Sequence, residues 1–421
     1  MARFVIRGGK PLRGEIAVSG AKNAVLKIFP VALLSEETIR VTNAPDIEDA
    51  RRAEEMLRLL GGTAERKGGA LELGGPTKGR CVDLPADLVN KFRASILFVG
   101  PLLATCGEVN FPHPGGCALG AVARPIDMFL DGFRKMGAHI AVKEDSYRLT
   151  ARKLKGAEIF FHKVTVTGTE SLMMTAVLAD GVTVLKNCAM EPEISALADY
   201  LNRAGAKIEG AGTPSIRIAG AKKLRGGEYA IIPDRIEAGT LAMLGAAIPG
   251  SDFRIVGSAP EHLEALWAQF DRIGARYEIS TNSVRVRGAK KLMAADIVTH
   301  EYPGFVTDLQ PPYTVLMTQA RGSSLIHETI YDRRLLFTDL LSQMGANITM
   351  ADPHRVVVHG KTPLYGRKMA SPDLRAGIAL VLAALVANGE TQIDNIYQIE
   401  RGYEKLESRL QRLGADIKRA E

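Results

Sequence analysis

Six copies of one short phrase, an apolar residue followed by glycine and a small residue, recur along this chain. The glycines that the copies share are separated by 76, 68, 69, 71 and 69 residues, so the 421 residues divide into six units of nearly equal length. Self-similarity at a fixed period is typical of repeat architectures. We therefore predict a fold of six repeats, in which a residue that departs from the repeat is a candidate for function. The copies are Leu60-Gly61-Gly62, Met136-Gly137-Ala138, Ala204-Gly205-Ala206, Ile273-Gly274-Ala275, Met344-Gly345-Ala346 and Leu413-Gly414-Ala415.

Each unit contains two kinds of helical pattern between strand-like segments. The first kind is apolar nearly all round, as in Ala238–Ile248, Ala376–Ala387 and Ser171–Ala179, and predicts a buried helix. The second kind has an apolar stripe at spacings of three and four residues, which indicates a helix with one solvent-exposed face. Two stripes are Leu263, Leu266, Trp267, Phe270 and Ile273, and Tyr403, Leu406, Leu410 and Leu413. Alternating strands and helices place the chain in the α/β class.

The strands differ from the helices because they alternate polar and apolar residues, as in Arg254–Val256 and Arg285–Arg287. One face of each sheet must then meet water, so we expect helices inside and sheets outside. Six units contain too many residues for one hydrophobic core, because a single core stops growing when the chain reaches roughly 250 to 300 residues. We expect two domains of three units each, 22–232 and 1–21 plus 233–421, because the strand-like start of the chain completes the sixth unit. The active site is expected in the cleft between them.

The composition limits the location and the partners. Hydrophobic residues make up 46% and charged residues 24% of the chain, as in ordinary soluble proteins. No apolar run is long enough to span a membrane, and the start has no stretch of signal-peptide length, so we expect a cytoplasmic protein without a membrane partner. The net charge of +7 is spread without a basic run. This pattern favours small anionic substrates and gives no support to nucleic-acid binding.

The second unit breaks the repeat with a longer loop. In this unit 30 residues separate Gly107, which follows the apolar helical pattern, from Gly137 of the repeated phrase. The corresponding interval is 23 to 25 residues in the four later units. The surplus, 112–123, is rich in proline and glycine and carries Cys117. Inserted loops in repeat proteins often carry the binding face, although an ordinary surface loop is the alternative. A reactive thiol needs a nearby cation, and Arg124 is the nearest.

The cysteines do not suggest a metal or a disulfide framework. The four are spaced irregularly, so reduced thiols are expected. His113 lies near Cys117, but no further ligand cluster accompanies the two. We therefore expect no metal.

Polar and charged residues stand at the starts of the otherwise apolar helices. Capping accounts for the aspartates at about 1 kcal/mol each, but not for Lys22 or Arg93, because the helix dipole disfavours cations there. Helix starts that carry cations favour phosphate or carboxylate groups. Arg401, expected to open the last amphipathic helix, either joins these cations or is a solvated helix start. The residues at the helix starts are Lys22, Asn23, Arg93, Lys163, Thr165, Thr167, Asp234, Arg235, Asp308, Asp373 and Arg375.

Over nearly its full length the chain resembles the enolpyruvyl transferase family. The segments that carry the resemblance are 14–24, 114–117 with 124–127, 233–237, 307–310, 373–375 and 399–404. The family's fold implies two domains of inside-out α/β barrel type with three repeats each.

The resemblance implies transfer of the enolpyruvyl group of phosphoenolpyruvate to the C3 hydroxyl of UDP-N-acetylglucosamine, with release of phosphate. This is the first committed step of peptidoglycan precursor synthesis, and it needs no metal or organic cofactor. The implied partners are these two small molecules. The epoxide antibiotic fosfomycin is expected to alkylate Cys117.

The resemblance also implies roles for individual residues. Cys117 matches the acid that protonates phosphoenolpyruvate, and Asp308 is the candidate base near the sugar hydroxyl. Lys22, Arg124 and Arg401 match cations around phosphoenolpyruvate. Asn23 matches a contact to the intermediate. Pro125, Ile126, Asp127, Lys163, Thr165, Thr167 and Ile330 match nucleotide contacts, and Arg93, Arg334, Asp373 and Arg375 match the wider polar lining.

Two departures from the family pattern leave alternatives open. The stretch Ala121–Ala123 stands where the family has one small residue, and Phe129 stands where a histidine is usual. A different nucleotide acceptor is one alternative. Shikimate-3-phosphate is another, although Asn23 and the Cys117 loop disfavour it. A catalytically silent UDP-sugar-binding relative is the third.

Overall fold

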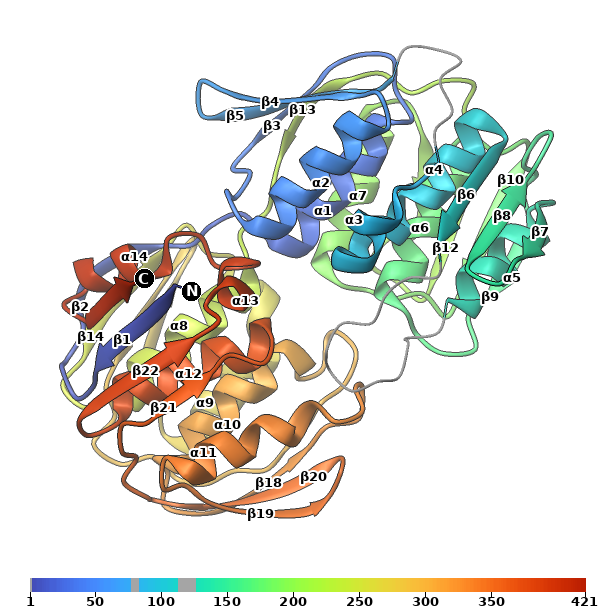
Figure 1. Cartoon of the computed structure of the whole chain (residues 1–421). Coiled ribbons are helices and arrows are strands. Elements are labelled where there is room, and N and C mark those ends of the chain that lie inside the picture. Colours follow the sequence, from blue (N-terminus) through green and yellow to red (C-terminus); the bar gives the residue numbers. More distant parts are fainter. Residues whose placement is uncertain (1, 77–82, 113–125) are drawn as a thin grey trace. The chain divides into compact units, whose positions relative to one another are not determined.

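The computed structural model describes residues 2–76, 83–112 and 126–421, and the chain forms two compact units. One unit is built from residues 20–232, and we call it the 20–232 unit. The other combines residues 2–19 with 233–421, and we call it the 233–421 unit. Each unit contains three sheets and its own hydrophobic core (Figure 1).

The 20–232 unit has the sheet orders β13-β3-β5-β4, β6-β8-β7 and β11-β12-β10-β9. Its elements are α1 (Lys22–Ala32), β3 (Ile39–Thr42), α2 (Glu48–Leu59), β4 (Thr63–Lys67), β5 (Ala70–Gly74), α3 (Ala86–Lys91), the 3-10 helix η1 (Arg93–Ser95), α4 (Ile96–Cys106), β6 (Glu108–Pro112), α5 (Asp127–Lys135), β7 (His139–Val142), β8 (Ser146–Thr150), β9 (Glu158–Phe160), α6 (Val166–Ala176), β10 (Val182–Lys186), α7 (Pro192–Arg203), β11 (Lys207–Glu209), β12 (Ser215–Ala219) and β13 (Gly227–Ala230).

The 233–421 unit has the sheet orders β21-β22-β1-β23, β15-β16-β14-β2 and β17-β18-β20-β19. Its elements are β1 (Arg3–Arg7), β2 (Arg13–Ala17), α8 (Arg235–Ala247), β14 (Asp252–Val256), η2 (Pro260–Leu263), α9 (Glu264–Ile273), β15 (Arg276–Ser280), β16 (Ser283–Arg287), β17 (Ile297–Val298), η3 (Thr307–Leu309), α10 (Gln310–Thr318), β18 (Gly322–His327), η4 (Arg334–Phe337), α11 (Thr338–Gln343), β19 (Asn347–Asp352), β20 (Arg355–Gly360), β21 (Lys368–Ala370), α12 (Leu374–Val386), β22 (Glu390–Asp394), α13 (Tyr397–Glu400), α14 (Leu406–Arg412) and β23 (Asp416–Ala420).

The apolar helices lie inside each unit, as the sequence predicts. Every residue of α8 is buried, and so are all residues of α12 except the last. Figure 1 shows these helices within the 233–421 unit and its sheets on the outer side. A helix without a polar stripe has no face to present to water, so it packs on other helices while the half-polar sheets cover it. The predicted α/β fold with helices inside is confirmed.

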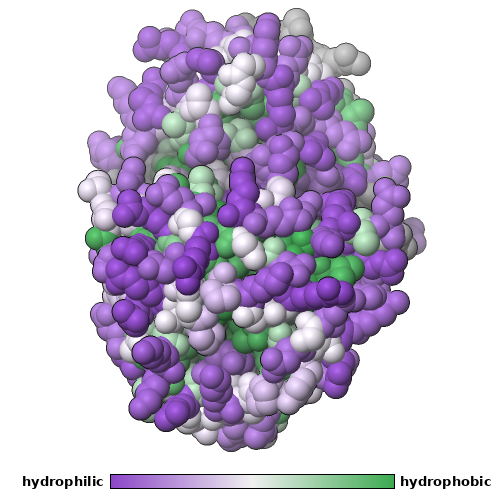
Figure 2. Space-filling view, turned by 90° about the vertical axis from the view of Figure 1, so that its left-hand side faces the viewer, coloured by the Kyte–Doolittle hydropathy of each residue, from purple (hydrophilic) through white to green (hydrophobic). Residues whose placement is uncertain are grey.

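The outward faces of the sheets are polar. In β14, Phe253 and Ile255 are buried and Arg254 is exposed, and β16 alternates in the same way. Figure 2 shows a surface made mainly of hydrophilic side chains, with hydrophobic residues in small separate patches. The period of two along a strand therefore separates core from water in this protein, as predicted.

The repeated glycines mark the ends of helices. The phrase glycines Gly61, Gly137, Gly205, Gly274, Gly345 and Gly414 all have left-handed φ values, from 71° to 110°. At the end of α9 the Gly274 N–H donates to Asp271 O, and the Ala275 N–H donates to Phe270 O. Glycine adopts this conformation without a steric penalty, so a chain that must leave a helix sharply uses it. The repeat seen in the sequence is thus a repeat of helix endings.

The first strands of the chain complete sheets of the 233–421 unit. Strand β1 pairs antiparallel with β22 and β23, which places Phe4 opposite Ile393 and Ile6 opposite Ile417. Strand β2 pairs parallel with β14, which places Ile16 opposite Ile255. The expectation that the start of the chain completes the sixth unit is confirmed for β1, whereas β2 joins the sheet of the fourth unit.

Two expectations need correction. The stripe that begins at Tyr403 is not one helix, because α14 begins at Leu406 after Lys405, whose φ is 42°. Cys106 is disulfide-bonded, so the expectation of reduced thiols is wrong for it. Spacing along the chain cannot reveal this bond, which depends on distance in space. Cys188 is free and buried.

In the part of the chain that the structure describes, no helix is both long and apolar enough to cross a membrane.

Candidate functional site

The predicted site residues fall into two groups, one in each unit. Cys117, Arg124 and Pro125 lie outside the described residues. In the 20–232 unit the group comprises Lys22, Asn23, Arg93, Ile126, Asp127, Lys163, Thr165 and Thr167. In the 233–421 unit it comprises Asp308, Ile330, Arg334, Asp373, Arg375 and Arg401.

Asp308 is the centre of the group in the 233–421 unit. Its Oδ1 accepts a hydrogen bond from Arg334 Nη2 at 2.7 Å, and its Oδ2 lies 2.7 Å from Arg375 Nη2. The side chains of Arg334 and Arg375 are 5% and 9% exposed, and that of Asp308 is 20% exposed. The carboxylate therefore has one guanidinium on each oxygen and keeps limited access to solvent.

This arrangement fixes the charge of Asp308. Burial by itself would raise its pKa, but the attraction and hydrogen bonds of Arg375 and Arg334 hold the pKa well below its usual range. The carboxylate is thus ionised at neutral pH, which is the form that accepts a proton. A low pKa also makes it a weak base, so the pairs must loosen, or the donor must become acidic, before a proton transfers.

Asp308 does not cap a helix, which corrects one sequence interpretation. Neither η3 nor α10 has a capping hydrogen bond from a side chain. Asp234 and Asp373 do cap, and Asp373 Oδ1 accepts hydrogen bonds from the backbone N–H groups of Arg375 (2.8 Å) and Ala376 (3.0 Å). The cap fixes the first turn of α12 and so the point from which Arg375 reaches Asp308.

Glu328 is a residue of this group that the sequence analysis missed. It is fully buried, and its Oε1 accepts hydrogen bonds from the backbone N–H groups of Ile330 (2.9 Å) and Tyr331 (3.1 Å). Thr307 Oγ1 donates to the same carboxylate at 2.9 Å. Glu328 therefore joins the segment of Ile330 to the turn that carries Asp308. A carboxylate directly after strand β18 was the available signal.

Arg401 is placed differently from the expectation. It follows directly after α13 and does not open the last amphipathic helix, which begins at Leu406. Its Nη1 donates to Gln398 Oε1 at 3.1 Å, and the residue is half-buried. The prediction of a helix start at Arg401 is wrong, because the phrase around it folds as a short helix and turn.

In the 20–232 unit, Lys22 and Asn23 begin α1, which starts without a side-chain cap. Lys22 Nζ lies 2.8 Å from Asp49 Oδ2 on α2, and the two side chains are 12% and 7% exposed. The ion pair holds the ammonium in place at the helix start. A fixed cation at the start of a helix suits an anionic ligand.

A second buried pair, also missed in the sequence, lies one turn further along α1. Lys27 Nζ is 3.1 Å from Glu170 Oε2 of α6, and both side chains are buried. Burial raises the pKa of Glu170 to about 7; Lys27 opposes this shift, and Glu193 and Glu191 add to it. Lys27 sits in an otherwise apolar run, and this single charge was the signal for it.

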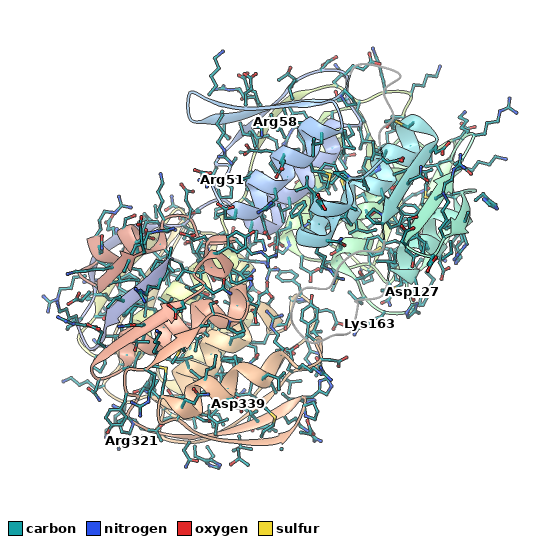
Figure 3. All side chains as sticks on the ribbon, viewed as in Figure 1. Arg51, Arg58, Asp127, Lys163, Arg321 and Asp339 are labelled. Atoms are coloured by element: carbon teal, nitrogen blue, oxygen red, sulfur yellow. The ribbon has the colours of Figure 1, made fainter. Side chains whose placement is uncertain are left out.

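The predicted nucleotide contacts of the 20–232 unit that the structure describes lie where α5 and α6 begin, whereas Ile330 lies in the other unit. Thr165 caps α6, with its Oγ1 accepting a hydrogen bond from Gly168 N at 3.2 Å. Asp127 is the first residue of α5, and its Oδ2 lies 3.9 Å from His162 Nε2, next to Lys163. Figure 3 labels Asp127 and Lys163, whose side chains lie at the same end of this unit. Both are exposed, as a nucleotide contact requires.

Two further predicted residues have mixed surroundings. Ile126 directly precedes α5 and is partly buried against the core, and Arg93 begins η1 and is partly buried. Phe129, which replaces the family's usual histidine, is 5% exposed and belongs to the core of the unit. Phe129 therefore has a packing role in α5.

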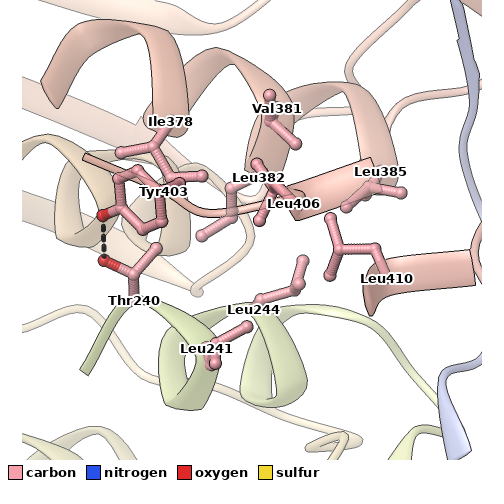
Figure 4. Close-up of a pocket in the computed structure, with 10 residues that line it drawn as sticks. All are labelled: Thr240, Leu241, Leu244, Ile378, Val381, Leu382, Leu385, Tyr403, Leu406 and Leu410. Carbon is pink, nitrogen blue, oxygen red and sulfur yellow. Dashed lines mark hydrogen bonds between the residues drawn. The ribbon is translucent and has the colours of Figure 1, made fainter. Parts of the chain in front are cut away.

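Two hollows lie away from these residues. One of about 830 Å³ lies on the outer face of β2, β14 and β16, where Asp252 accepts hydrogen bonds from Arg285 at 2.7 and 2.8 Å. The other, of about 10 Å³, lies in the core among α8, α12 and α14 (Figure 4). Leucines line most of it, and Thr240 Oγ1 lies 3.3 Å from Tyr403 Oη. Its size is near the limit for one water molecule, so it is a packing gap.

The chemistry available in both groups is that of cations and one ionised carboxylate. Lysine and arginine side chains can hold phosphate and carboxylate groups and stabilise negative charge that develops during a reaction. Among the described residues no cluster of three or more histidine, cysteine or acidic side chains could hold a metal ion.

Known proteins resemble the chain along its whole length. The model of the family EPSP synthase (3-phosphoshikimate 1-carboxyvinyltransferase) matches residues 6–410. A UDP-N-acetylglucosamine 1-carboxyvinyltransferase of Koribacter versatilis is 46% identical, over 100% of this chain and 96% of the relative. One of Desulforapulum autotrophicum is 45% identical over the full length of both chains.

Solved structures agree in fold. The enolpyruvyl transferase NikO from Streptomyces tendae superposes with a TM-score of 0.90 at 25% identity, over 100% of this chain and 99% of the other. EPSP synthase from Acinetobacter baumannii superposes with a TM-score of 0.75 at 19% identity over both full chains.

Proposed function

Because this chain belongs to the EPSP synthase family, we propose that it is an enolpyruvyl transferase that uses phosphoenolpyruvate as donor and UDP-N-acetylglucosamine as acceptor. The observation that carries the proposal is the identity of 45% to 46% with UDP-N-acetylglucosamine 1-carboxyvinyltransferases, which extends over the whole chain. The products are the 3-O-enolpyruvyl UDP-sugar and phosphate. The reaction is the first committed step of peptidoglycan precursor synthesis.

We propose that the reaction proceeds by addition and elimination. A proton from Cys117 goes to C3 of phosphoenolpyruvate, and the acceptor oxygen forms a bond to C2 while its own proton leaves. The tetrahedral intermediate then loses a proton from C3 and expels phosphate, which restores the double bond. The cations Lys22, Arg124 and Arg401 balance the phosphate and carboxylate charges through both steps.

Asp308 has the role of proton acceptor in this proposal. Its ionised state is supported by the two guanidinium groups on its oxygens. Because its pKa is low, it accepts a hydrogen bond from the acceptor hydroxyl first and takes the proton as that hydroxyl becomes acidic during attack. Ile126, Asp127, Lys163, Thr165, Thr167 and Ile330 are proposed as contacts to the nucleotide.

The division into domains 22–232 and 1–21 plus 233–421 stays part of this proposal, with the two groups of residues serving one reaction. The proposed partners are the two small substrates. Nucleic acid and membranes have no role in the proposal, and its location is the cytoplasm.

The test is phosphate release from phosphoenolpyruvate with UDP-N-acetylglucosamine, run in parallel with shikimate-3-phosphate and with UMP. We expect release with the UDP-sugar alone, and loss of that release in the Cys117→Ala variant. Release with another acceptor would reassign the substrate. Tight binding of the UDP-sugar without release from any donor would indicate a silent binding protein. Alkylation by fosfomycin, located by mass spectrometry, is expected at Cys117 and at no other cysteine.

A further inference from the structure

The strongest unused feature of the molecule is the buried pair of Lys27 and Glu170. We infer that these two are positioning residues, whose ion pair holds the start of α1 and the start of α6 at a fixed distance. The inference rests on the proposed function, because that proposal assigns Lys22 and Asn23 on α1 to the donor. The start of α6 carries proposed nucleotide contacts.

On α1, Lys27 is tied to the first turn of its own helix. It lies four residues after Asn23, so the two share a helix face. Its Nζ donates a hydrogen bond to the backbone oxygen of Asn23 at 2.5 Å and lies 3.1 Å from Glu170 Oε2. The side chain of Lys27 is 8% exposed. One ammonium group therefore contacts both the donor-binding turn of α1 and the carboxylate of α6.

On α6, Glu170 lies about one turn after the capping residue Thr165. Its side chain is fully buried, and within the described part of the chain neither oxygen has a hydrogen-bond partner of good geometry, so Lys27 holds it as an ion pair at 3.1 Å. A buried carboxylate held by a single cation resists separation from it, because separation leaves two unpaired charges away from water. The pair thus acts as a stiff connection between two helix starts.

Stability does not account for this pair. Replacement of a buried ion pair by apolar residues of similar volume is often neutral or stabilising. The residues that flank them in sequence, Val25, Leu26 and Ile28 on α1 and Leu172 and Met173 on α6, are apolar and buried, so the pair stands in an otherwise apolar part of both helices. What the charged pair adds is a specific distance and direction between the two helices.

The charges that act on Glu170 come from two elements. Lys27 comes from α1, while Glu191 and Glu193 come from the start of α7 and raise the pKa of Glu170. Tyr229 of β13 is also buried and adds no charge, because burial raises the pKa of its hydroxyl and keeps it neutral at physiological pH. Helix α4, which packs on α6, contributes no charged side chain. Glu170 therefore changes charge near neutral pH, and the connection weakens as it takes a proton.

The test compares Glu170→Gln and Lys27→Met in steady-state kinetics at pH 8. A positioning role predicts that both variants raise the KM for phosphoenolpyruvate, by about tenfold, with kcat within about threefold of wild type. If the two charges acted only through their electrostatic effect on the anionic donor, the KM for phosphoenolpyruvate would change in opposite directions in the two variants, because one variant removes a negative charge and the other a positive charge. Opposite directions, or an unchanged KM in both, would overturn the inference.

The matched control is Glu54→Gln in the same unit. Glu54 of α2 is 8% exposed and pairs with Arg58 and Arg66 at 3.2 and 2.9 Å, but it joins no two helix starts of the site. We expect its variant to lose stability without a change in KM. Lys27→Arg, which keeps the cation, should return KM to within about threefold of wild type.

A pH profile completes the test. In wild type the KM for phosphoenolpyruvate should rise as pH falls through about 7, where Glu170 takes its proton. Glu170→Gln should flatten that part of the profile. Wild-type protein without turnover would contradict the proposed function instead, and direct titration of phosphoenolpyruvate would then still report on the pair.

Discussion

Asp308 and Glu170 are carboxylates of the two different units, both largely removed from water, yet their pKa values move in opposite directions. Burial raises both, but Asp308 has a guanidinium on each oxygen, and its pKa is held well below its usual range. Glu170 has one ammonium at 3.1 Å and two glutamates nearby, and its pKa rises to about 7. The side chain of Asp308 is 20% exposed and that of Glu170 is fully buried, but the number and sign of the neighbouring charges decide the direction in which each pKa moves.

This difference separates two uses of a buried carboxylate. Asp308 must be charged to accept a proton, and its single negative charge is paired with two guanidinium groups. A residue that links two helices needs only one partner, and its charge is then sensitive to pH near neutrality. The predictions below start from the largest expected effect.

Replacement of Asp308 by Asn should lower turnover by about 10² to 10⁴-fold, because the variant cannot take up the proton of the acceptor hydroxyl. The affinity for the UDP-sugar, measured by titration, should stay within about tenfold, or about 1.4 kcal/mol. The control is Asp352→Asn, which removes a partly exposed carboxylate paired with Arg355 and should leave turnover unchanged. A loss confined to binding would make Asp308 a ligand contact only.

Replacement of Lys27 by Met should destabilise the protein by about 3 to 5 kcal/mol at pH 8, because Glu170 is left buried without a cation. Chemical denaturation measures this loss. The double variant Lys27→Met/Glu170→Met should recover to within about 1 kcal/mol of wild type or exceed it. If the double variant were as unstable as the single one, the loss would come from packing and not from the unpaired charge.

The two carboxylates should give opposite pH signatures. Between about pH 4.5 and 7 the native state holds a proton on Glu170 that the unfolded chain has lost, so stability falls as pH rises, by about 3 kcal/mol in total. The Glu170→Gln variant should lack this slope. Asp308 contributes stability above about pH 4 that is lost as pH falls toward its lower folded pKa. Unfolding free energies measured from pH 3 to 8 test both signs.

Tyr403→Phe should have the smallest effect. Its hydroxyl lies 3.3 Å from Thr240 Oγ1, and burial raises its pKa to about 12, so it is a neutral neighbour of the Asp308 cluster. Loss of one neutral hydrogen bond costs about 1 kcal/mol. Turnover should change by less than about threefold. A larger effect would show that neutral groups, and not only the two arginines, set the state of Asp308.

Much of the fold could be predicted from residue patterns. The six phrase glycines all adopt left-handed φ angles, and the run around Ala238–Ile248 is a fully buried helix. These features depend on local backbone sterics and on hydrophobic periodicity, which are properties of short segments. The ends of helices were less certain, and Tyr403 and Arg401 were both placed in a helix that begins at Leu406.

The candidate site was predicted as a set of residues but not as an arrangement. The sequence identified Asp308, Arg334 and Arg375 through the resemblance, yet it assigned Asp308 to capping. It gave no sign that Glu328 joins their segments or that Lys27 meets Glu170. Phe129 was a candidate for altered specificity, and the structure places it in the core.

The sequence by itself determined the number of repeats, the inward position of the apolar helices and the family of the chain. Each of these depends on residues that are close together in the sequence or on the spacing at which residues recur. Only the tertiary structure decided which charges meet. Glu170 and Lys27 come from different repeats, and Asp308 and Arg334 lie 26 residues apart. Partners at such separations are chosen by packing, and the pKa of each carboxylate follows from those partners.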